Sequence, residues 1–504
     1  VRGHDRESSA MKPRRRAHAS RFAMLTSIAA IAITGCATAQ TRPAQTPQIT
    51  QAEAQQGAQA NVQILQEFGG AMTGPQASYV ESIGKTIALQ SGLANARDTF
   101  KVAMLNSCVN NAFAIPGGYI YTTRQLVTLM NNEAELAGVL GHEVGHVAAR
   151  HSQRRQQTAQ RNSILGAIGS ILSGVILGNS GLGQALSQGI QQGSQLLTLR
   201  FSRSQELEAD QLGQQYLTRA GYDPHAMATV LASLAMQNNL DAQLQGRNSG
   251  QIPAWASTHP DPASRVAAAN KRAANSSGMT NRDTFLTRID GLLYGDDPKQ
   301  GVIEGQQFIH PDMRLAFSAP NGFYMVNGTQ AVSINGQSGQ AQLTLAQYNG
   351  NLESYVANVF ARLGGQNAQL RPSSIQRTTV NGIPAAYATV RANSGNQQVD
   401  VTVFAYEFAN DRAYHFQAVT AAGRSGVFNP MFASMRRVTA GEAARVVPRV
   451  IDVVTVGPRD TVQSLASRMA YSNAQVERFR VLNGLRSNET LRPGQKVKVV
   501  VYAR

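Results

Sequence analysis

The sequence predicts a multidomain protein with a mainly α-helical domain that carries a few short strands, an α+β module and a small C-terminal module. The chain has 504 residues, too many for one compact core. Apolar residues recur at helical spacing up to about residue 275 and alternate with polar residues, as in strands, beyond about residue 305. We therefore expect a helical domain over 61–275, a linker over 276–304, an α+β module over 305–445 and a C-terminal module over 446–504.

Paired histidines lie on one predicted helix of the first domain. Over 135–150 the apolar residues follow the helical period, which predicts a helix with one buried face. His142 and His146 are four positions apart, so their Cβ atoms lie about 5–6 Å from each other on one side of that helix. Two imidazoles in this arrangement can bind one zinc ion, with Glu143 directed at the metal-bound water.

A second predicted helix, over 201–213, offers carboxylates for the same site. Glu206 and Asp210 lie one turn apart on one face. A glutamate from a second helix can complete a His2Glu zinc site, and a carboxylate one turn later can accept the other ring N–H of a ligand histidine. Glu208 faces another direction, so we expect it to be solvated or paired. His151 is five positions past His146 and is predicted to be a solvated or capping residue.

These two segments and the run 111–121 resemble the HtpX/BepA-type family of zinc endopeptidases, over about residues 50–275. The resemblance implies a zincin-type metalloprotease domain with a small edge sheet, which binds Zn²⁺. It implies His142, His146 and Glu206 as zinc ligands, Glu143 as general base and Asp210 as the partner of a ligand. The segment 257–265 also matches, and in such relatives its histidine, here His259, can approach the metal and gate it. An oxyanion donor is left open between His259 and Arg203.

A short strand, a Pro-Gly-Gly turn and a second strand are predicted over 112–122. The resemblance makes the first of these the edge strand beside the metal helix. Its residues are Ala112, Phe113, Ala114 and Ile115. An extended protein substrate can pair with such an edge through backbone hydrogen bonds. The alternative is an ordinary hairpin.

The N-terminal segment is expected to be a signal peptide over 1–35. It has a basic start, an apolar stretch over 22–34 that is too short for an ordinary membrane span, and then Cys36. This resembles a bacterial lipobox, which implies a lipid on Cys36 and a flexible tether over 36–60. A plain signal peptide is the alternative. The apolar segment 163–177 is also too short for a span and is either a mobile lid or a core helix.

The C-terminal segment resembles a lysin-motif (LysM) module. The resemblance rests on the apolar pattern from Val454 to Leu465, on 482–485 and on 491–499. It implies a βααβ fold that binds peptidoglycan, with Asp460, Thr461 and Asn483 as glycan-binding residues. Arg459 departs from the pattern, where glycine is usual. The alternative is a structural cap without a ligand.

The function that we expect is that of an envelope-localised zinc endopeptidase acting on misfolded or outer-membrane client proteins at the periplasmic face of the outer membrane. The formal charge of +16 favours anionic surfaces, and we find no zinc finger or helix-turn-helix pattern, so no nucleic-acid partner is expected. The partners are protein substrates, the membrane through Cys36, and peptidoglycan. The rivals are a chaperone or assembly factor with a latent zinc site, and a peptidoglycan-binding lipoprotein without protease activity.

Overall fold

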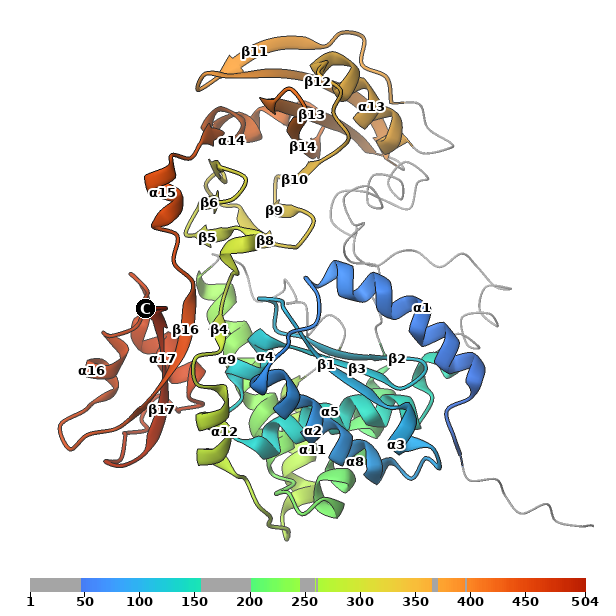
Figure 1. Ribbon diagram of the computed structural model, residues 1–504, viewed down its shortest axis with the longest axis vertical. Helices are drawn as coiled ribbons and strands as arrows, with labels where there is room; N and C mark the ends of the chain where they lie inside the picture. The colour runs from blue at the N-terminus through green and yellow to red at the C-terminus, as the bar shows by residue number, and fades with distance from the viewer. Residues whose placement is uncertain (1–46, 156–200, 245–258, 260–261, 365–369, 395–396) are drawn as a thin grey trace, which may run out of the picture. The chain divides into compact units, whose positions relative to one another are not determined.

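The computed structural model describes residues 47–155, 201–244, 259, 262–364, 370–394 and 397–504 (Figure 1). The predicted signal peptide, Cys36, the predicted tether up to residue 46 and the apolar segment 163–177 lie outside the described residues. The predicted tether from residue 51 onward is wrong, because these residues form the start of α1 (Gln51–Glu67). Within these ranges, none of the helices combines the length and the hydropathy needed to span a bilayer.

The first domain packs helices against one small sheet (Figure 1). The sheet has the strand order β1-β3-β2, with β1 and β3 parallel and β2 antiparallel to β3. Helix α1 begins earlier than expected, because Thr50 and Glu53 form a capping box at its start. The elements are α1 (Gln51–Glu67), α2 (Pro75–Ala88), η1 (Leu89–Ser91), α3 (Ala96–Thr99), β1 (Lys101–Leu105), β2 (Ala112–Ile115), β3 (Tyr119–Thr123), α4 (Arg124–Leu129), α5 (Glu133–Ala148), α8 (Arg203–Arg219), α9 (Ala226–Leu244), α11 (Pro262–Ala273) and α12 (Arg282–Ile289).

Helix α5, which carries the paired histidines, lies at the centre of this domain. It contacts α2, α8, α9, α12 and strands β2 and β3. Every residue from Glu133 to His146 is buried, so the prediction of a single buried face is wrong. The sequence period reflects the strongly apolar side of α5, whereas the glycines and carboxylates of its other side face neighbouring elements rather than water.

Glycines allow α5 and α8 to approach closely. A Cβ atom added to Gly213 on α8 would lie 2.9 Å from the backbone N of His142, and one added to Gly145 on α5 would lie 3.1 Å from the carbonyl oxygen of Ala209. Real side chains at these positions would push the helices apart. The close approach is what brings the carboxylates of α8 within reach of the histidines of α5.

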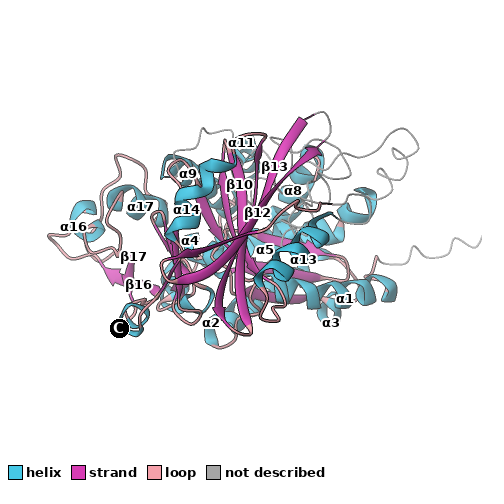
Figure 2. Ribbon diagram, turned by 90° about the horizontal axis from the view of Figure 1, so that it is seen from above, coloured by secondary structure: helices cyan, strands magenta, loops and turns pink. Residues whose placement is uncertain are grey.

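The middle module contains helices and two antiparallel sheets. The larger sheet has the order β11-β12-β13-β14-β10-β9-β8 and the smaller one the order β15-β7-β6-β5. Alternation along β13 divides its side chains between two cores: Phe404 and Tyr406 face the smaller sheet, and Val401 and Val403 face helix α13. Figure 2 shows α13 beside the strands of the larger sheet. The elements are η3 (Pro298–Gln300), β5 (Val302–Glu304), β6 (Gln307–His310), β7 (Leu315–Ser318), β8 (Tyr324–Asn327), β9 (Val332–Gly336), β10 (Gly339–Leu345), α13 (Leu352–Gly364), β11 (Gln376–Val380), β12 (Ile383–Ser394), β13 (Gln397–Ala409), β14 (Arg412–Ala421), η4 (Ser425–Phe428), α14 (Asn429–Ser434), β15 (Arg436–Arg437) and α15 (Ala440–Ala444).

The C-terminal module has the order β16 (Arg449–Thr455), α16 (Val462–Ala466), α17 (Gln475–Leu482) and β17 (Lys496–Tyr502), with β16 and β17 antiparallel. A third strand, β4 (Leu293–Tyr294), pairs with β16 and comes from the stretch 276–304. That stretch was expected to be a linker, but it also contributes α12, whose Phe285, Leu286 and Ile289 lie in the core of the first domain. The stretch ends in β5, which belongs to the middle module, so it contributes elements to all three modules.

A buried lysine joins β17 to the first domain. Lys498 is fully buried, and its Nζ donates to the carbonyl oxygens of Thr128, at 2.7 Å, and Met130, at 2.6 Å, where α4 ends. These carbonyls have no partner within the helix, so a cation is favourable there. Burial lowers the pKa of Lys498 and raises the pKa of nearby Glu135, and each charge partly offsets the shift of the other.

Candidate metal centre

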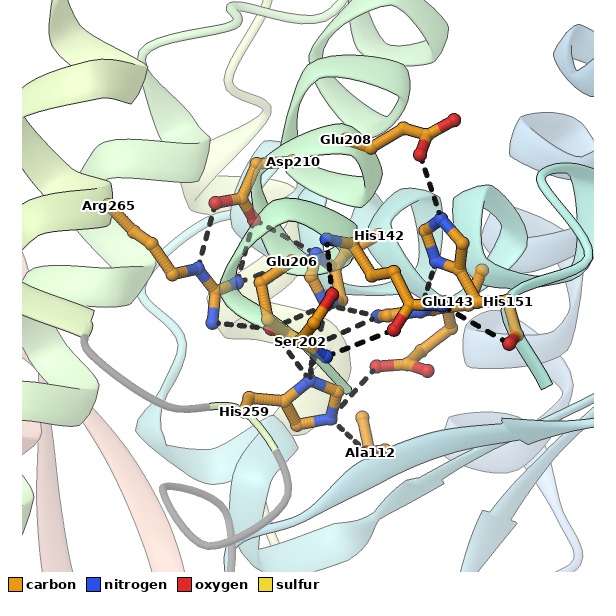
Figure 3. Close-up of polar contacts among 12 residues, drawn as sticks. Ala112, His142, Glu143, His151, Ser202, Glu206, Glu208, Asp210, His259 and Arg265 are labelled. Atoms are coloured by element: carbon orange, nitrogen blue, oxygen red, sulfur yellow. Dashed lines mark hydrogen bonds and ion pairs between the residues drawn. The ribbon is translucent and has the colours of Figure 1, made fainter. Parts of the chain in front are cut away.

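The structure brings together the three predicted metal ligands and adds a fourth residue. His142 and His146 come from α5 and Glu206 from α8, and the fourth residue is His259, which precedes α11 in the sequence (Figure 3). The Nε2 atoms of His142 and His146 are 2.9 Å apart, and each lies 3.5 Å from an oxygen of Glu206. The Nδ1 atom of His259 lies 3.1 Å from Glu206 and 3.3 Å from His142. Each of the four residues offers one candidate ligand atom, and these four atoms all lie within 4.8 Å of one another.

This donor set fits a zinc ion. Three imidazoles and one carboxylate, all buried, are the ligand types of tetrahedral zinc sites. Glu143 supports the fit, because both of its carboxylate oxygens are buried and neither has a hydrogen-bond partner among the described residues. Its burial raises its pKa, and His259 Nε2 lies 3.6 Å from Oε1. A buried carboxylate without a donor is costly unless a further group, such as a metal-bound water, lies beside it.

Asp210 holds His142 by the ring nitrogen that faces away from the cluster. Asp210 Oδ1 lies 2.9 Å from Nδ1 of His142, as the sequence predicted for a ligand's partner. Arg265 on α11 binds Asp210 through two nitrogens, at 2.7 and 2.8 Å, and reaches Glu206 at 2.9 Å. Burial alone would raise the pKa of Asp210, but the hydrogen bonds from Arg265 and His142 outweigh it and lower that pKa.

Arg265 is a residue of the site that no sequence pattern assigned. It is the last residue of the matching segment 257–265 and lies in the first turn of α11 (Pro262–Ala273). It is 1% exposed, and its guanidinium offsets the charge of two buried carboxylates. For Glu206 the burial penalty is outweighed by His259, His142 and Arg265, so its pKa is lowered. The signal in the sequence that could have indicated Arg265 is its place six positions after His259, a candidate ligand.

His151 differs from its predicted role, whereas Glu208 matches its prediction. His151 is fully buried rather than solvated, with Nδ1 2.8 Å from Nδ1 of His146. Its Nε2 lies 3.2 Å from Glu208 Oε2. Glu208 keeps 43% of its side chain exposed and also pairs with Arg154 at 2.7 Å. Glu208 was expected to be solvated or paired, and it is in fact both.

The remaining predicted residues of this domain lie at different distances from the cluster. Strand β2, formed by Ala112, Phe113, Ala114 and Ile115, is at one edge of its sheet. His259 Nε2 lies 3.4 Å from the carbonyl oxygen of Ala112, so the edge strand borders the site. Arg203 is the exposed first residue of α8, whereas His259 is buried and lies among the candidate metal ligands. His259 is thus the better supported of the two for a role at the metal.

Comparison with known families agrees with this geometry. Residues 75–273 match the model of peptidase family M48, and residues 454–500 match that of the LysM domain. The chain contains an M48 peptidase domain. The matched range includes the paired histidines, Glu206 and His259, and the second match covers most of β16–β17.

Similar proteins share the M48 region. The beta-barrel assembly-enhancing protease of Escherichia coli strain K12 is 36% identical over 218 residues, which are 42% of this chain and 43% of that protein. The protein of the same name from Yersinia pestis is 34% identical over 197 residues, 39% of this chain and 38% of that protein. The mitochondrial metalloendopeptidase OMA1 of Schizosaccharomyces pombe is 29% identical over 207 residues, 40% of this chain and 56% of that protein. The chain therefore spans less than half the length of these two beta-barrel assembly-enhancing proteases.

The three residues expected to bind glycan lie in unlike surroundings in the LysM domain. Thr461 is exposed and caps α16, and the half-buried Asp460 accepts a hydrogen bond from the backbone N–H of Gly457 at 2.7 Å. Asn483 is 5% exposed, and its amide bonds to backbone groups of Phe479 and Lys498. Its polar atoms are engaged inside the module, so we assign Asn483 a structural role and keep Asp460 and Thr461 as candidate glycan contacts.

Proposed function

We propose that this protein is a zinc-dependent endopeptidase of the bacterial cell envelope that hydrolyses misfolded or outer-membrane client proteins. The observation that carries the proposal is the convergence of His142, His146 and Glu206 beside the carboxylate of Glu143, which has no hydrogen-bond partner among the described residues. The M48 peptidase domain and the names of the relatives support the reaction class and the kind of client.

The chain's own residues have distinct tasks in this reaction. His142, His146 and Glu206 would hold the zinc ion, which when bound supplies a Lewis acid that polarises the scissile carbonyl and lowers the pKa of a water. Glu143 takes the proton from the attacking water and delivers it to the leaving amine. Asp210, held by Arg265, keeps the Nε2 atom of His142 directed at the metal.

The substrate class follows from the edge strand. Strand β2 presents one side of its backbone at the end of the sheet, next to the cluster. An extended segment of an unfolded protein can pair there with little demand on its sequence. Binding through backbone hydrogen bonds, with little dependence on sequence, suits a protease that removes misfolded clients. Lipid on Cys36 and peptidoglycan bound near Asp460 and Thr461 would keep the enzyme at the periplasmic face of the outer membrane.

His259 supports a latent resting state. Its Nδ1 lies among the metal-directed atoms, so it can complete four protein ligands and leave no position for substrate. A protein that spends much of its time in this state could act as a chaperone or assembly factor with occasional cleavage. Displacement of His259 would then convert the closed site into a catalytic one with three protein ligands.

Replacement of His259 with alanine tests this gating. If about 90% of the molecules have His259 on the metal, its removal should raise casein cleavage up to about tenfold. The rate of appearance of acid-soluble peptides measures it. His225→Ala is the matched control, because His225 is half-buried in the same domain and pairs with Asp223 away from the cluster. Unchanged or slower cleavage by the His259 variant contradicts gating.

The central experiment is degradation of casein by the full chain, with and without a chelator, together with metal analysis. We expect one zinc ion per chain, cleavage that stops on chelation, and recovery on addition of zinc. Zinc binding without cleavage of casein or of an unfolded outer-membrane protein would favour the assembly-factor alternative. Absence of both zinc and cleavage would leave only a peptidoglycan-binding lipoprotein.

A further inference from the structure

The ring of His146 is held on its far side by a chain of side chains that the zinc site itself does not require. Nδ1 of His146 lies 2.8 Å from Nδ1 of His151, and Nε2 of His151 lies 3.2 Å from Oε2 of Glu208 (Figure 3). Phe201 stacks on the His146 ring, with centroids 4.0 Å apart and planes inclined by 25°. The ring is therefore restrained on one face and at its far nitrogen.

One arrangement of protons satisfies this chain. A metal is bound by a bare ring nitrogen, and Nε2 of His146 is the atom that faces Glu206 and His142. The proton of His146 then lies on Nδ1, which donates to Nδ1 of His151. His151 in turn carries its proton on Nε2, which donates to the carboxylate of Glu208. Both hydrogen bonds point outward from the cluster, and each ring has a defined tautomer.

The backbone after α5 makes this contact possible. In a continued helix, a residue five positions on is rotated by about 140° and cannot face its predecessor. Helix α5 ends at Ala148, and Arg150 adopts a left-handed conformation with φ of 54°. Non-glycine residues rarely take this conformation, because Cβ comes too close to a backbone oxygen. Arg150 is held by Glu53 at 3.2 Å and by the carbonyl of Gln48 at 2.8 Å, so that His151 turns back beneath His146.

The two ligand histidines are thus oriented in different ways. His142 is held by Asp210, which is fully buried and clamped by Arg265. His146 is held through a second imidazole by Glu208, a carboxylate that is 43% exposed. Without His151, the Nδ1 proton of His146 would have no hydrogen-bond acceptor among the described residues. The ring can then take the wrong tautomer or rotate away from the metal.

We propose that His151 and Glu208 are positioning residues that fix the tautomer and orientation of His146 and thereby set the affinity of the site for zinc. The proposal rests on the proposed function, because it requires the metal to bind through Nε2 of His146. Neither residue touches the metal or the substrate.

The test measures zinc affinity of the full chain by competition with a chromogenic chelator, and the absorption spectrum of the cobalt-substituted protein. His151→Phe keeps a ring of similar size and removes the acceptor, and we expect it to weaken zinc binding about 10–100-fold and to change the cobalt bands. Glu208→Ala should also weaken zinc binding and change the cobalt bands, but by less than His151→Phe does. Glu208→Gln should restore most of the affinity, because its amide oxygen still accepts the proton of His151.

Controls separate positioning from a general loss of structure. His225→Phe and Glu81→Ala change a histidine and a partly exposed glutamate of the same domain, and both should bind zinc as the wild type does. The metal-free thermal midpoint of the Glu208 variants should also match the wild type, since Glu208 is a surface residue.

The possible outcomes are distinct. Wild-type zinc affinity and cobalt spectrum in His151→Phe overturn the proposal while leaving the zinc site intact. If His151→Phe does not fold, Glu208→Ala decides in the same way, because wild-type affinity there also overturns it. Failure of the wild-type chain itself to bind zinc contradicts the proposed function instead.

Discussion

Replacing Glu143 with glutamine should reduce cleavage of an unfolded protein at least about 100-fold while the protein still binds zinc. Glutamine keeps the shape of the side chain but cannot accept the proton of the attacking water. Glu143 is 1% exposed, and burial raises its pKa, so a neutral amide should be tolerated without loss of stability. Casein cleavage and zinc content measured on the same preparation check the prediction.

Two further variants serve as comparisons for Glu143→Gln. Glu81→Gln removes one carboxylate from a surface pair with Lys85 and should leave cleavage unchanged. Glu206→Gln should instead lower the zinc content, because it weakens a ligand rather than the base. A Glu143→Gln protein that cleaves at the wild-type rate would refute the mechanism, and one that loses its zinc would show that Glu143 acts as a ligand.

Replacing Lys498 with methionine should lower the free energy of unfolding by about 3 kcal/mol. Methionine matches the length of the lysine stem but leaves the carbonyl oxygens of Thr128 and Met130 without their donor. It also removes the positive charge that offsets the buried carboxylate of Glu135, which bonds to Asn131 and Thr229. A shift of the urea midpoint, followed by circular dichroism, measures the loss.

Lys496 provides the matched control for Lys498. It lies two positions away on the same strand, is partly exposed, and bonds through Nζ to the hydroxyl of Thr287 at 3.0 Å. Lys496→Met should change stability by less than about 0.5 kcal/mol. Equal midpoints for the two variants would mean that the buried ammonium contributes nothing to the attachment of the LysM domain. Glu135→Gln in the Lys498→Met background should recover part of the loss, because it removes the unpaired charge.

The candidate ligands could be predicted because metal chemistry leaves a local pattern. His142, Glu143 and His146 occupy one helix at the spacing of a zinc-binding motif, and Glu206 and Asp210 lie one turn apart on a second helix. The structure brings all five to one place. The contacts of His151, Arg265 and Lys498 were not predicted. Their partners lie far away in the sequence or across a break in the helix, where hydrophobic periodicity carries no information.

Burial was the property that the sequence pattern described least well. The pattern over 135–150 shows one apolar stripe, but α5 is enclosed on all sides. The stretch 276–304 is not a free connection, because it supplies α12, β4 and β5 to three modules. Both differences arise because a polar or small residue is compatible with either water or a close neighbour. Gly213 illustrates this, because the sequence does not distinguish a glycine that packs against α5 from a glycine in an exposed loop.

By itself, the sequence was enough to predict a zinc peptidase site with two imidazoles, a carboxylate ligand and a base, because metal chemistry restricts residue type and spacing within single helices. The resemblance also predicted that His259 approaches the metal, but only the tertiary structure decided that Arg265 compensates two carboxylates and that His151 reverses direction to contact His146. These depend on where separate elements come to rest, and that position is set by packing across the whole domain rather than by any local run of residues.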